Sequence, residues 1–288
     1  MKNFKGKAIY NPSGKAGEYS YWACNFYVGC SNGCTYCYCK KGLLAKAMGH
    51  DKPQLKKCFK NGTYALSKFK EEVDLNMKEL ERHGLFFSFT TDPMLPETIL
   101  LTKSAAEFAV LSDVAVKILT KKVDWVDTWI DKYFVKVGNP RIFETKHLWA
   151  FGFTLTGHDD LEPNASTNTE RIQAMRTLHD AGFKTFASLE PIIDFDSSWK
   201  MIIESFPYCD LFKIGLESGK KYNKYELIKF IESINLLFSD LLQTKVYFKD
   251  SLLKAAGINR ADLPENCVSR DYNIFNQQIR KHELPKTI

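Results

Sequence analysis

The sequence lacks the patterns that bind nucleotides through glycine-rich loops, since neither G-x-G-x-x-G nor G-x4-G-K-S/T occurs in its 288 residues. A dinucleotide-binding fold and a P-loop are therefore disfavoured. The six histidines form neither H-x-H nor H-E-x-x-H, so a histidine-based metal site has little support. A run of about 18 apolar residues, which a membrane-spanning helix needs, is also missing.

Residues 1–7 lack the apolar stretch of a secretory leader, so we expect a cytoplasmic protein with no membrane partner. Neither sign of charge dominates, because 40 Lys and Arg against 34 Asp and Glu give a net charge of +6. This charge permits an anionic partner but falls short of the basic stripe expected of a dedicated nucleic-acid binder. A mixed-charge surface is the simpler interpretation.

Short apolar runs alternate with helical patterns along most of the chain, which indicates parallel βα units. Such units build either an open doubly wound sheet or a full or partial barrel. The periodicity fades near residue 255, so we expect one domain over residues 1–254 and a carboxyl-terminal extension over 255–288 that contains Pro264 and Pro285. The expected strands are Leu85–Thr90, Val114–Thr120, Leu148–Leu155, Lys184–Glu190, Leu211–Gly215 and Lys245–Lys249.

Three helices have clear sequence signals. The first buries Leu66, Phe69, Val73, Met77 and Leu80 and ends before Gly84. The second has a capping box at Thr167 and Glu170 and buries Ile172, Met175 and Leu178. The third opens at Asn223-x-x-Glu226 and presents Leu227, Ile231, Ile234, Phe238 and Leu241.

Five of the eight cysteines lie within sixteen positions, at Cys24, Cys30, Cys34, Cys37 and Cys39. In a long chain without a secretory leader, this crowding indicates metal binding in a reducing compartment rather than disulfides. Cys30, Cys34 and Cys37 have the spacing C-x3-C-x2-C. Three thiolates can hold a metal or a cluster and leave one coordination position open.

A structural zinc site normally has four ligands, often in paired C-x2-C knuckles. Cys34 and Cys37 supply one knuckle, and the downstream cysteines occur singly. Cys24 or Cys39 would complete a four-cysteine site, so a zinc-stabilised interaction module without catalysis stays open. The ferredoxin spacing C-x2-C-x2-C-x3-C is absent, which argues against a simple electron carrier.

The C-x3-C-x2-C spacing, with Tyr36 directly before the last cysteine, resembles the radical S-adenosylmethionine (SAM) superfamily. That resemblance implies that Cys30, Cys34 and Cys37 hold a [4Fe-4S] cluster whose fourth iron is chelated by SAM. It implies that reductive cleavage of SAM gives a 5′-deoxyadenosyl radical, which abstracts hydrogen from a substrate. It also implies a partial (β/α)6 TIM-like barrel with its first strand at Ala23–Val28, and an electron donor such as a flavodoxin or a ferredoxin.

A closer resemblance, over roughly residues 29–199, is to spore photoproduct lyase and its photolyase-like relatives. The order and spacing of several short motifs carry it. They are Phe89-Thr90-Thr91-Asp92, Leu119-Thr120-Lys121, Phe153-Thr154-Leu155, Leu161-Glu162-Pro163, Glu170-Arg171-Ile172 and Glu190-Pro191-Ile192.

By this resemblance, Thr91, Lys121 and Thr154 contact SAM, and Tyr36 approaches its adenine through the backbone. Glu162 and Arg171 are expected to have structural roles. Ordinary strand threonines and a solvated loop lysine remain the alternatives at these positions. Glu190 stands at the end of an apolar strand, so we expect it at the barrel mouth or paired with a cation. Glu217 is a further candidate for the same mouth.

One position departs from the lyase. Its hydrogen-donating cysteine aligns here with Phe89, and phenylalanine has no S–H bond to give. The resemblance therefore favours nucleic acid as the first candidate substrate but puts thymine-dimer repair in doubt. Cys39, Cys58 or Cys209 are alternative donors, although a free cysteine is commonly a small buried hydrophobe. A peptide, an RNA or a small metabolite is the alternative substrate.

Overall fold

The computed structural model describes residues 4–134, 144–239 and 244–275. Its centre is an eight-stranded sheet in the order β1-β2-β5-β6-β7-β8-β9-β10, in which every neighbouring pair is parallel except β1 with β2. Strands β1 and β10 are the two edges of the curved sheet, so the sheet is an open, partial TIM-like barrel. This architecture confirms the expected α/β class. The strands are β1 (Ile9–Tyr10), β2 (Ala23–Cys24), β5 (Leu85–Phe87), β6 (Val116–Thr120), β7 (Trp149–Thr154), β8 (Lys184–Ile192), β9 (Leu211–Leu216) and β10 (Lys245–Phe248).

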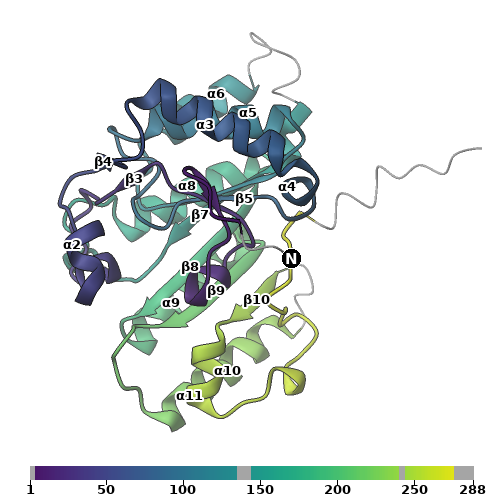
Figure 1. Cartoon of the computed structure of the whole chain (residues 1–288). Coiled ribbons are helices and arrows are strands. Elements are labelled where there is room, and N and C mark those ends of the chain that lie inside the picture. Colours follow the sequence, from purple (N-terminus) through teal and green to yellow (C-terminus); the bar gives the residue numbers. More distant parts are fainter. Residues whose placement is uncertain (1–3, 135–143, 240–243, 276–288) are drawn as a thin grey trace, which may run out of the picture.

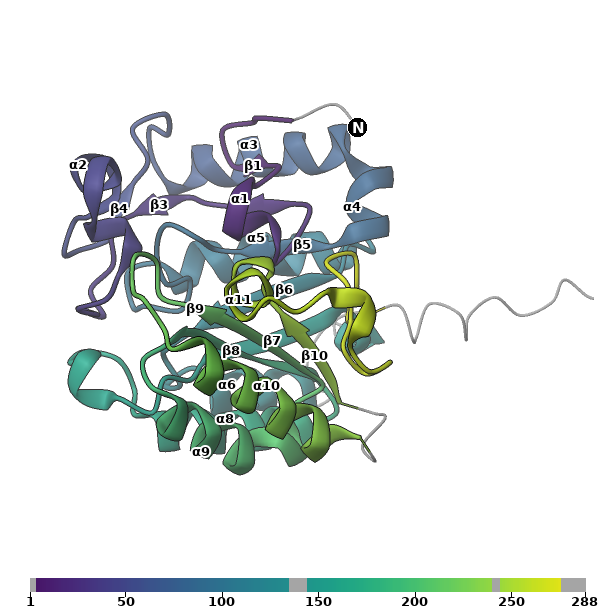
Figure 2. The same ribbon diagram turned by 90° about the horizontal axis from the view of Figure 1, so that it is seen from below.

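The larger helices lie along the outside of this curved sheet (Figures 1 and 2). They follow the strands in alternation, as parallel βα units require. The helices are α1 (Gly14–Gly17), α2 (Ala45–Met48), α3 (Gly62–Leu75), α4 (Met77–His83), α5 (Ile99–Leu111), α6 (Val126–Phe134), α8 (Asn168–Asp180), α9 (Phe195–Ser205), α10 (Lys224–Phe238) and α11 (Asp250–Ala256).

Residues on the two faces of the sheet belong to two different apolar clusters. The outward side chains, such as Phe87, Ile118 and Phe151, join the large core beneath the helices. The inward side chains, such as Phe86 and Phe186, form a smaller cluster inside the barrel. Because strand side chains alternate between faces, nearly every strand position is buried, which explains the apolar runs in the sequence.

The amino-terminal segment closes the gap that the open sheet leaves near β10. The Tyr247 hydroxyl donates to Glu18 Oε1 at 3.0 Å, and the backbone N–H of Asp250 donates to the same oxygen at 2.8 Å. Lys213 of β9 reaches inward and donates to the carbonyl of Glu18 at 2.8 Å. The segment that follows α1 is therefore fixed against β9, β10 and the start of α11.

Two expected strands are shorter in the structure by three residues or more. The strand expected at residues 23–28 ends at Cys24. Asn25 still donates its N–H to Ala8 beside β1, but toward the loop after β5 it is the Asn25 side-chain carbonyl that accepts from the N–H of Phe89. The chain then pairs elsewhere, as β3 (Tyr27–Val28) with β4 (Gln54–Leu55). The strand expected at residues 85–90 ends at Phe87.

The single helix expected through Met77 and Leu80 is two helices, α3 and α4. They meet at Asn76, which has φ −117° and ψ 17° and whose side chain donates to the carbonyl of Glu72 at 2.7 Å. This side-chain bond to the backbone competes with a continuous helix. The other two helices are confirmed: α8 has the complete capping box, and Asn223 caps α10. Leu241 lies outside the described residues.

The described part of the expected extension packs on the domain. Ala255 and Ala256 still belong to α11, and the backbone of Val268 bonds to Val246 of β10 at 2.8 Å. Ile274 and Phe275 are buried inside the barrel. The rest of the extension, with Pro285, lies outside the described residues, and the boundary at residue 255 stays a prediction. Within the described ranges, no helix is long and apolar enough to cross a bilayer.

Candidate active site at the mouth of the barrel

A cavity of about 450 Å³ opens at the carboxyl ends of the parallel strands. Its size is that of a cofactor or metabolite pocket. The ends of β5, β6, β7, β8 and β9, or the loops that follow them, reach its wall together with the cysteine loop. The residues singled out from the sequence as ligands of the cluster or of SAM all line it, namely Cys30, Cys34, Tyr36, Cys37, Thr91, Lys121, Thr154 and Glu190.

The cysteines stand on a loop that follows β3 and is held by backbone hydrogen bonds on both sides. The N–H of Cys30 donates to His50 at 3.0 Å, and the N–H of Thr35 donates to Leu161 at 3.0 Å. Gly33 has φ +74°, and a Cβ there would lie 3.2 Å from Pro163. Glycine therefore fits a left-handed position pressed against the loop after β7.

The three thiols differ in their environment. Burial raises the pKa of Cys30 to about 12, and Asp92 adds to this effect. Burial also raises the pKa of Cys34. A hydrogen bond from the Cys39 thiol lowers the pKa of Cys37 to about 6, against the effect of burial. In the metal-free chain, Cys37 is therefore the thiol most readily ionised at neutral pH.

Asp92 joins the cysteine loop to the strand ends. Its carboxylate accepts hydrogen bonds from Asn32 Nδ2 at 2.7 Å, Thr120 Oγ1 at 2.6 Å, the N–H of Lys121 at 2.8 Å and the N–H of Met94 at 3.0 Å. Four donors satisfy the carboxylate, although Asp92 is only 7% exposed. The sequence alone did not indicate this role, because three of the four donors lie 28 or more positions away in the chain.

Two buried polar atoms on the same wall have no hydrogen-bond partner among the described residues. They are Oγ1 of Thr91 and Oδ1 of Asn32. Thr91 is 9% exposed and Asn32 is 2% exposed, so bulk water does not satisfy them. A buried polar group without a partner costs about 1–3 kcal/mol. Polar groups of a bound ligand would remove that cost.

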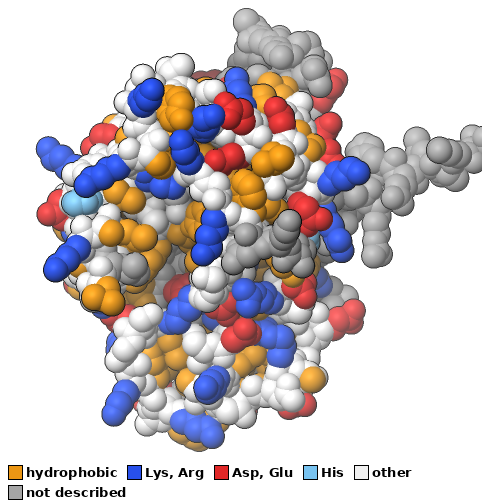
Figure 3. Space-filling model, in the orientation of Figure 1, with side chains coloured by type: hydrophobic (Ala, Val, Ile, Leu, Met, Phe, Trp, Pro, Cys, Tyr) orange, Lys and Arg blue, Asp and Glu red, His pale blue; other side chains and the backbone are white. Residues whose placement is uncertain are grey.

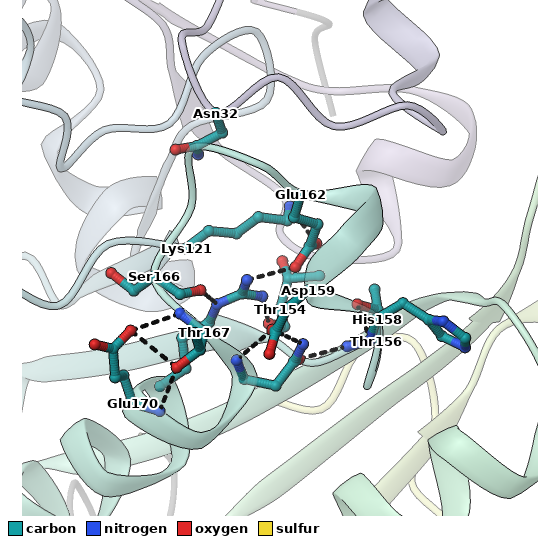
Figure 4. Close-up of polar contacts among 12 residues, drawn as sticks. Asn32, Lys121, Thr154, Thr156, His158, Asp159, Glu162, Ser166, Thr167 and Glu170 are labelled. Atoms are coloured by element: carbon teal, nitrogen blue, oxygen red, sulfur yellow. Dashed lines mark hydrogen bonds and ion pairs between the residues drawn. The ribbon is translucent and has the colours of Figure 1, made fainter.

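A buried ion pair supports the cysteine loop (Figure 4). Glu162 accepts from Arg171 Nη2 and from the Tyr36 hydroxyl, and both members of the Glu162–Arg171 pair are fully buried. Arg171 also donates to the carbonyl of Thr154 at 2.7 Å. Tyr36, between the second and third cysteines, is thus tied to β7 and α8 through its hydroxyl.

Lys121 lies between this ion pair and the cysteines. Its Nζ is 4.0 Å from Glu162 Oε1 and 5.7 Å from the centre of the Tyr36 ring. Burial is the largest single effect and lowers the pKa of Lys121, but Cys34, Glu162 and Asp92 together outweigh it, so the net shift is upward. The ammonium therefore remains charged beside the cavity.

Glu190 also lines the cavity and has a cation partner. Its carboxylate accepts from Lys249 Nζ at 2.7 Å and from the Tyr19 hydroxyl at 2.8 Å. The Tyr19 hydroxyl also lies 2.6 Å from Ser188 Oγ. Of the two expectations for Glu190, barrel mouth or ion pair, the structure shows both. Sequence reasoning missed Tyr19 and Lys249, which the fold brings to Glu190 from distant segments.

Phe89 also lines the cavity, stacked on Phe86 with ring centres 4.5 Å apart. The Tyr38 hydroxyl donates to the carbonyl of Phe89, and Cys39 Sγ lies 3.8 Å from the same oxygen. Of the three alternative donors, Cys39 lines the cavity. Cys58 is exposed and Cys209 is buried just before β9.

The donor set fits an iron–sulfur cluster. Three thiols and two unpartnered polar atoms line the same cavity. Cysteine thiolates are the ligands that hold iron–sulfur clusters in proteins. Among the described residues, no three Cys, His, Asp or Glu side chains are grouped closely enough to hold a single metal ion.

No protein-family model matches the sequence, and no curated protein matches it. Four chains of solved structures align with this chain, among them the following two. A variant of spore photoproduct lyase with bound AdoMet and a dinucleoside spore photoproduct has 15% identity and a TM-score of 0.47, over 85% of this chain and 62% of that one. SuiB of Streptococcus suis, bound to S-adenosylmethionine, has 13% identity and a TM-score of 0.47, over 83% and 50%.

This chain therefore spans 62% and 50% of the lengths of those two proteins. The first of them belongs to the group that the sequence motifs resemble. A likeness at this level does not assign a function, so the assignment depends on the residues of the cavity.

Proposed function

We propose that this chain is a radical SAM enzyme, in which Cys30, Cys34 and Cys37 hold a [4Fe-4S] cluster and the remaining cavity binds SAM. The observation that supports the proposal is the gathering of the candidate cluster and SAM ligands, from the cysteine loop and four separate strand ends, on the wall of one cavity. When bound, the cluster would supply one electron to SAM, and the 5′-deoxyadenosyl radical so formed would abstract hydrogen from the substrate.

The chain's own residues supply binding, orientation and charge. Thr91 offers a buried hydroxyl without a partner, and Lys121 offers a charged ammonium beside Cys34. These groups suit a ligand with a carboxylate and hydroxyls. Asp92 and Glu162 act as positioning residues, because each fixes the cysteine loop to neighbouring strands.

Nucleic acid, as a lesion or a nucleotide, is the first candidate substrate, on the strength of the motif resemblance. A peptide, an RNA or a small metabolite is the alternative. Phe89 lines the cavity, and by the motif resemblance it aligns with the lyase's donor cysteine, so we do not propose the lyase's own repair reaction. Incubation with deuterated candidate substrates would identify the substrate by the transfer of label into 5′-deoxyadenosine.

The proposal is tested by anaerobic reconstitution followed by reduction with dithionite in the presence of SAM. We expect a brown protein that forms 5′-deoxyadenosine, and we expect Cys34→Ala to lose both properties. Cys58→Ala is the matched control, because Cys58 is exposed and lies away from the cavity. A colourless protein with one tightly bound zinc would contradict the proposal.

A further inference from the structure

The positive charge of this chain is concentrated in one segment. Residues 40–60, here called the basic segment, contain seven Lys and one Asp. The segment therefore carries a net charge of +6, equal to that of the whole chain, and the remaining residues are balanced at 33 basic and 33 acidic. The overall composition conceals this asymmetry.

The basic segment lies directly against the cysteine loop. The carbonyl of His50 accepts from the N–H of Cys30 at 3.0 Å. Gly29 is pressed against the segment, since a Cβ there would lie 2.5 Å from the carbonyl of Lys52. In addition, β4 of the segment pairs with β3, which leads into the loop. The segment thus forms the outer cover of the cysteine loop.

Six of the seven lysines divide into two groups, and the seventh, Lys56, is half-buried and donates to the carbonyl of Lys7. Lys40 and Lys41 line the cavity and are paired, with Asp51 at 2.5 Å and with Glu217 at 2.8 Å. The second group, Lys46, Lys52, Lys57 and Lys60, is exposed, lies outside the cavity lining and forms no ion pair with a described residue. Figure 3 shows blue side chains around the side of the molecule where α2, β3 and β4 lie.

We propose that the basic segment is the docking surface for an acidic one-electron donor protein. This inference rests on the proposed function, in which each cleaved SAM sulfonium consumes one electron that breaks its C–S bond and releases methionine. A partner carrying a reduced flavin or an iron–sulfur centre supplies that electron and is itself oxidised by one electron. A partner seated on the basic segment faces the backbone of Cys30.

The placement of the unpaired lysines favours a protein donor over a nucleic-acid substrate. A substrate must enter the cavity, where the segment's lysines are already paired, whereas the unpaired lysines lie outside the cavity lining. Leu43, within the segment, is 97% exposed beside the lysines. An apolar side chain next to charges suits a protein interface, in which charges steer association and apolar contacts retain the partner.

Charge reversal tests the surface, with an acidic flavodoxin as the probe. The variant Lys46→Glu/Lys52→Glu/Lys57→Glu alters exposed side chains of the segment. Its matched control, Lys78→Glu/Lys221→Glu/Lys229→Glu, makes the same change in charge at exposed positions elsewhere. Cluster reduction is followed by stopped-flow absorbance, and flavodoxin binding to the unreduced chain is measured by calorimetry at about 50 mM and 300 mM salt.

We expect the segment variant to lose about tenfold or more in the second-order rate of reduction, and the control to change far less. Binding of the unaltered chain should weaken steeply with salt. Equal rates for both variants would overturn the proposal. So would a segment variant that keeps flavodoxin binding but loses binding to a DNA oligonucleotide, which would assign the segment to nucleic acid.

Two controls separate this inference from the function on which it rests. Both variants should melt at the temperature of the unaltered chain and should still form 5′-deoxyadenosine with dithionite. Failure of dithionite to produce 5′-deoxyadenosine with the unaltered chain would contradict the proposed function. The calorimetric comparison would still decide whether the segment binds an acidic protein.

Discussion

At Asp92, one buried carboxylate holds together three parts of the site. It accepts from Asn32 in the cysteine loop, from Thr120 and Lys121 at the end of β6, and from Met94 after β5. These polar bonds fix the cysteine loop relative to the strand ends. The position of the thiols should therefore be sensitive to changes at Asn32 and Asp92.

A reciprocal exchange tests this role. Asn32→Asp would place two carboxylates 2.7 Å apart in a buried site, and we expect it to lower the free energy of unfolding by about 2 kcal/mol or more. The double variant Asn32→Asp/Asp92→Asn restores a donor and an acceptor, and it should recover at least about 1 kcal/mol. Urea unfolding and the iron content after reconstitution measure the effect. Additive losses in the double variant would show that the two side chains do not act as a pair.

The thiols give a prediction about pH. The pKa of Cys37 is lowered to about 6, so its reactive thiolate accumulates as the pH rises through 6, whereas Cys30, with a pKa raised to about 12, stays protonated. In the metal-free chain at pH 7, iodoacetamide should therefore modify Cys37 well before Cys30. Peptide mass spectrometry distinguishes these sites from the exposed Cys58.

The control for this prediction is Cys39→Ala, which removes the hydrogen bond that lowers the pKa of Cys37. Alkylation of Cys37 should then begin at higher pH. The account of the thiol environment is wrong if Cys30 reacts as fast as Cys37 at pH 7, or if Cys39→Ala leaves the pH profile of Cys37 unchanged.

At the scale of elements, the loop between β7 and α8 acts as a support for the cysteine loop. Its Glu162 and the Arg171 of α8 are fully buried, and the Tyr36 hydroxyl bonds to the same carboxylate. The sequence signal for α8 was strong because the capping box is local. The support itself could not be predicted in detail, since Tyr36 and Glu162 are separated by 126 positions.

Glu162→Gln tests the support, because it leaves Arg171 as a buried charge without its counter-ion. We expect it to lower the free energy of unfolding by about 3–5 kcal/mol. Glu204→Gln is the control: it breaks the exposed pair with Lys200, at 3.8 Å, and should cost less than about 1 kcal/mol. Similar urea midpoints for the two variants would contradict a structural role for the buried pair.

Local signals also explain which elements the sequence predicted well. The sequence segments of β6, β7, β8 and β9 are apolar because both faces of the sheet are covered by other parts of the protein. The strand expected at residues 23–28 is shorter because the Asn25 side chain, and not a backbone carbonyl, accepts from the N–H of Phe89. That side-chain contact is set by the tertiary structure, which periodicity does not report.

At the scale of the whole molecule, the open barrel brings the cysteine motif and residues outside any motif to one cavity. The cysteine spacing located part of the cavity lining from sequence alone. The partners of Glu190 could be found only from the fold, because Tyr19 and Lys249 reach it from the first and last parts of the chain. The concentration of charge in residues 40–60 also became informative once the structure placed that segment against Cys30.

The central claim is that three thiolates hold a cluster with an iron left open for SAM. The most direct measurement is electron–nuclear double resonance on the reduced, reconstituted protein with SAM labelled with ¹⁵N at its amino group. We expect a hyperfine coupling from the labelled nitrogen, and we expect it to disappear when unlabelled SAM replaces the labelled compound. A reduced cluster that shows no coupling to the label, or a chain that binds zinc in place of a cluster, would contradict the account.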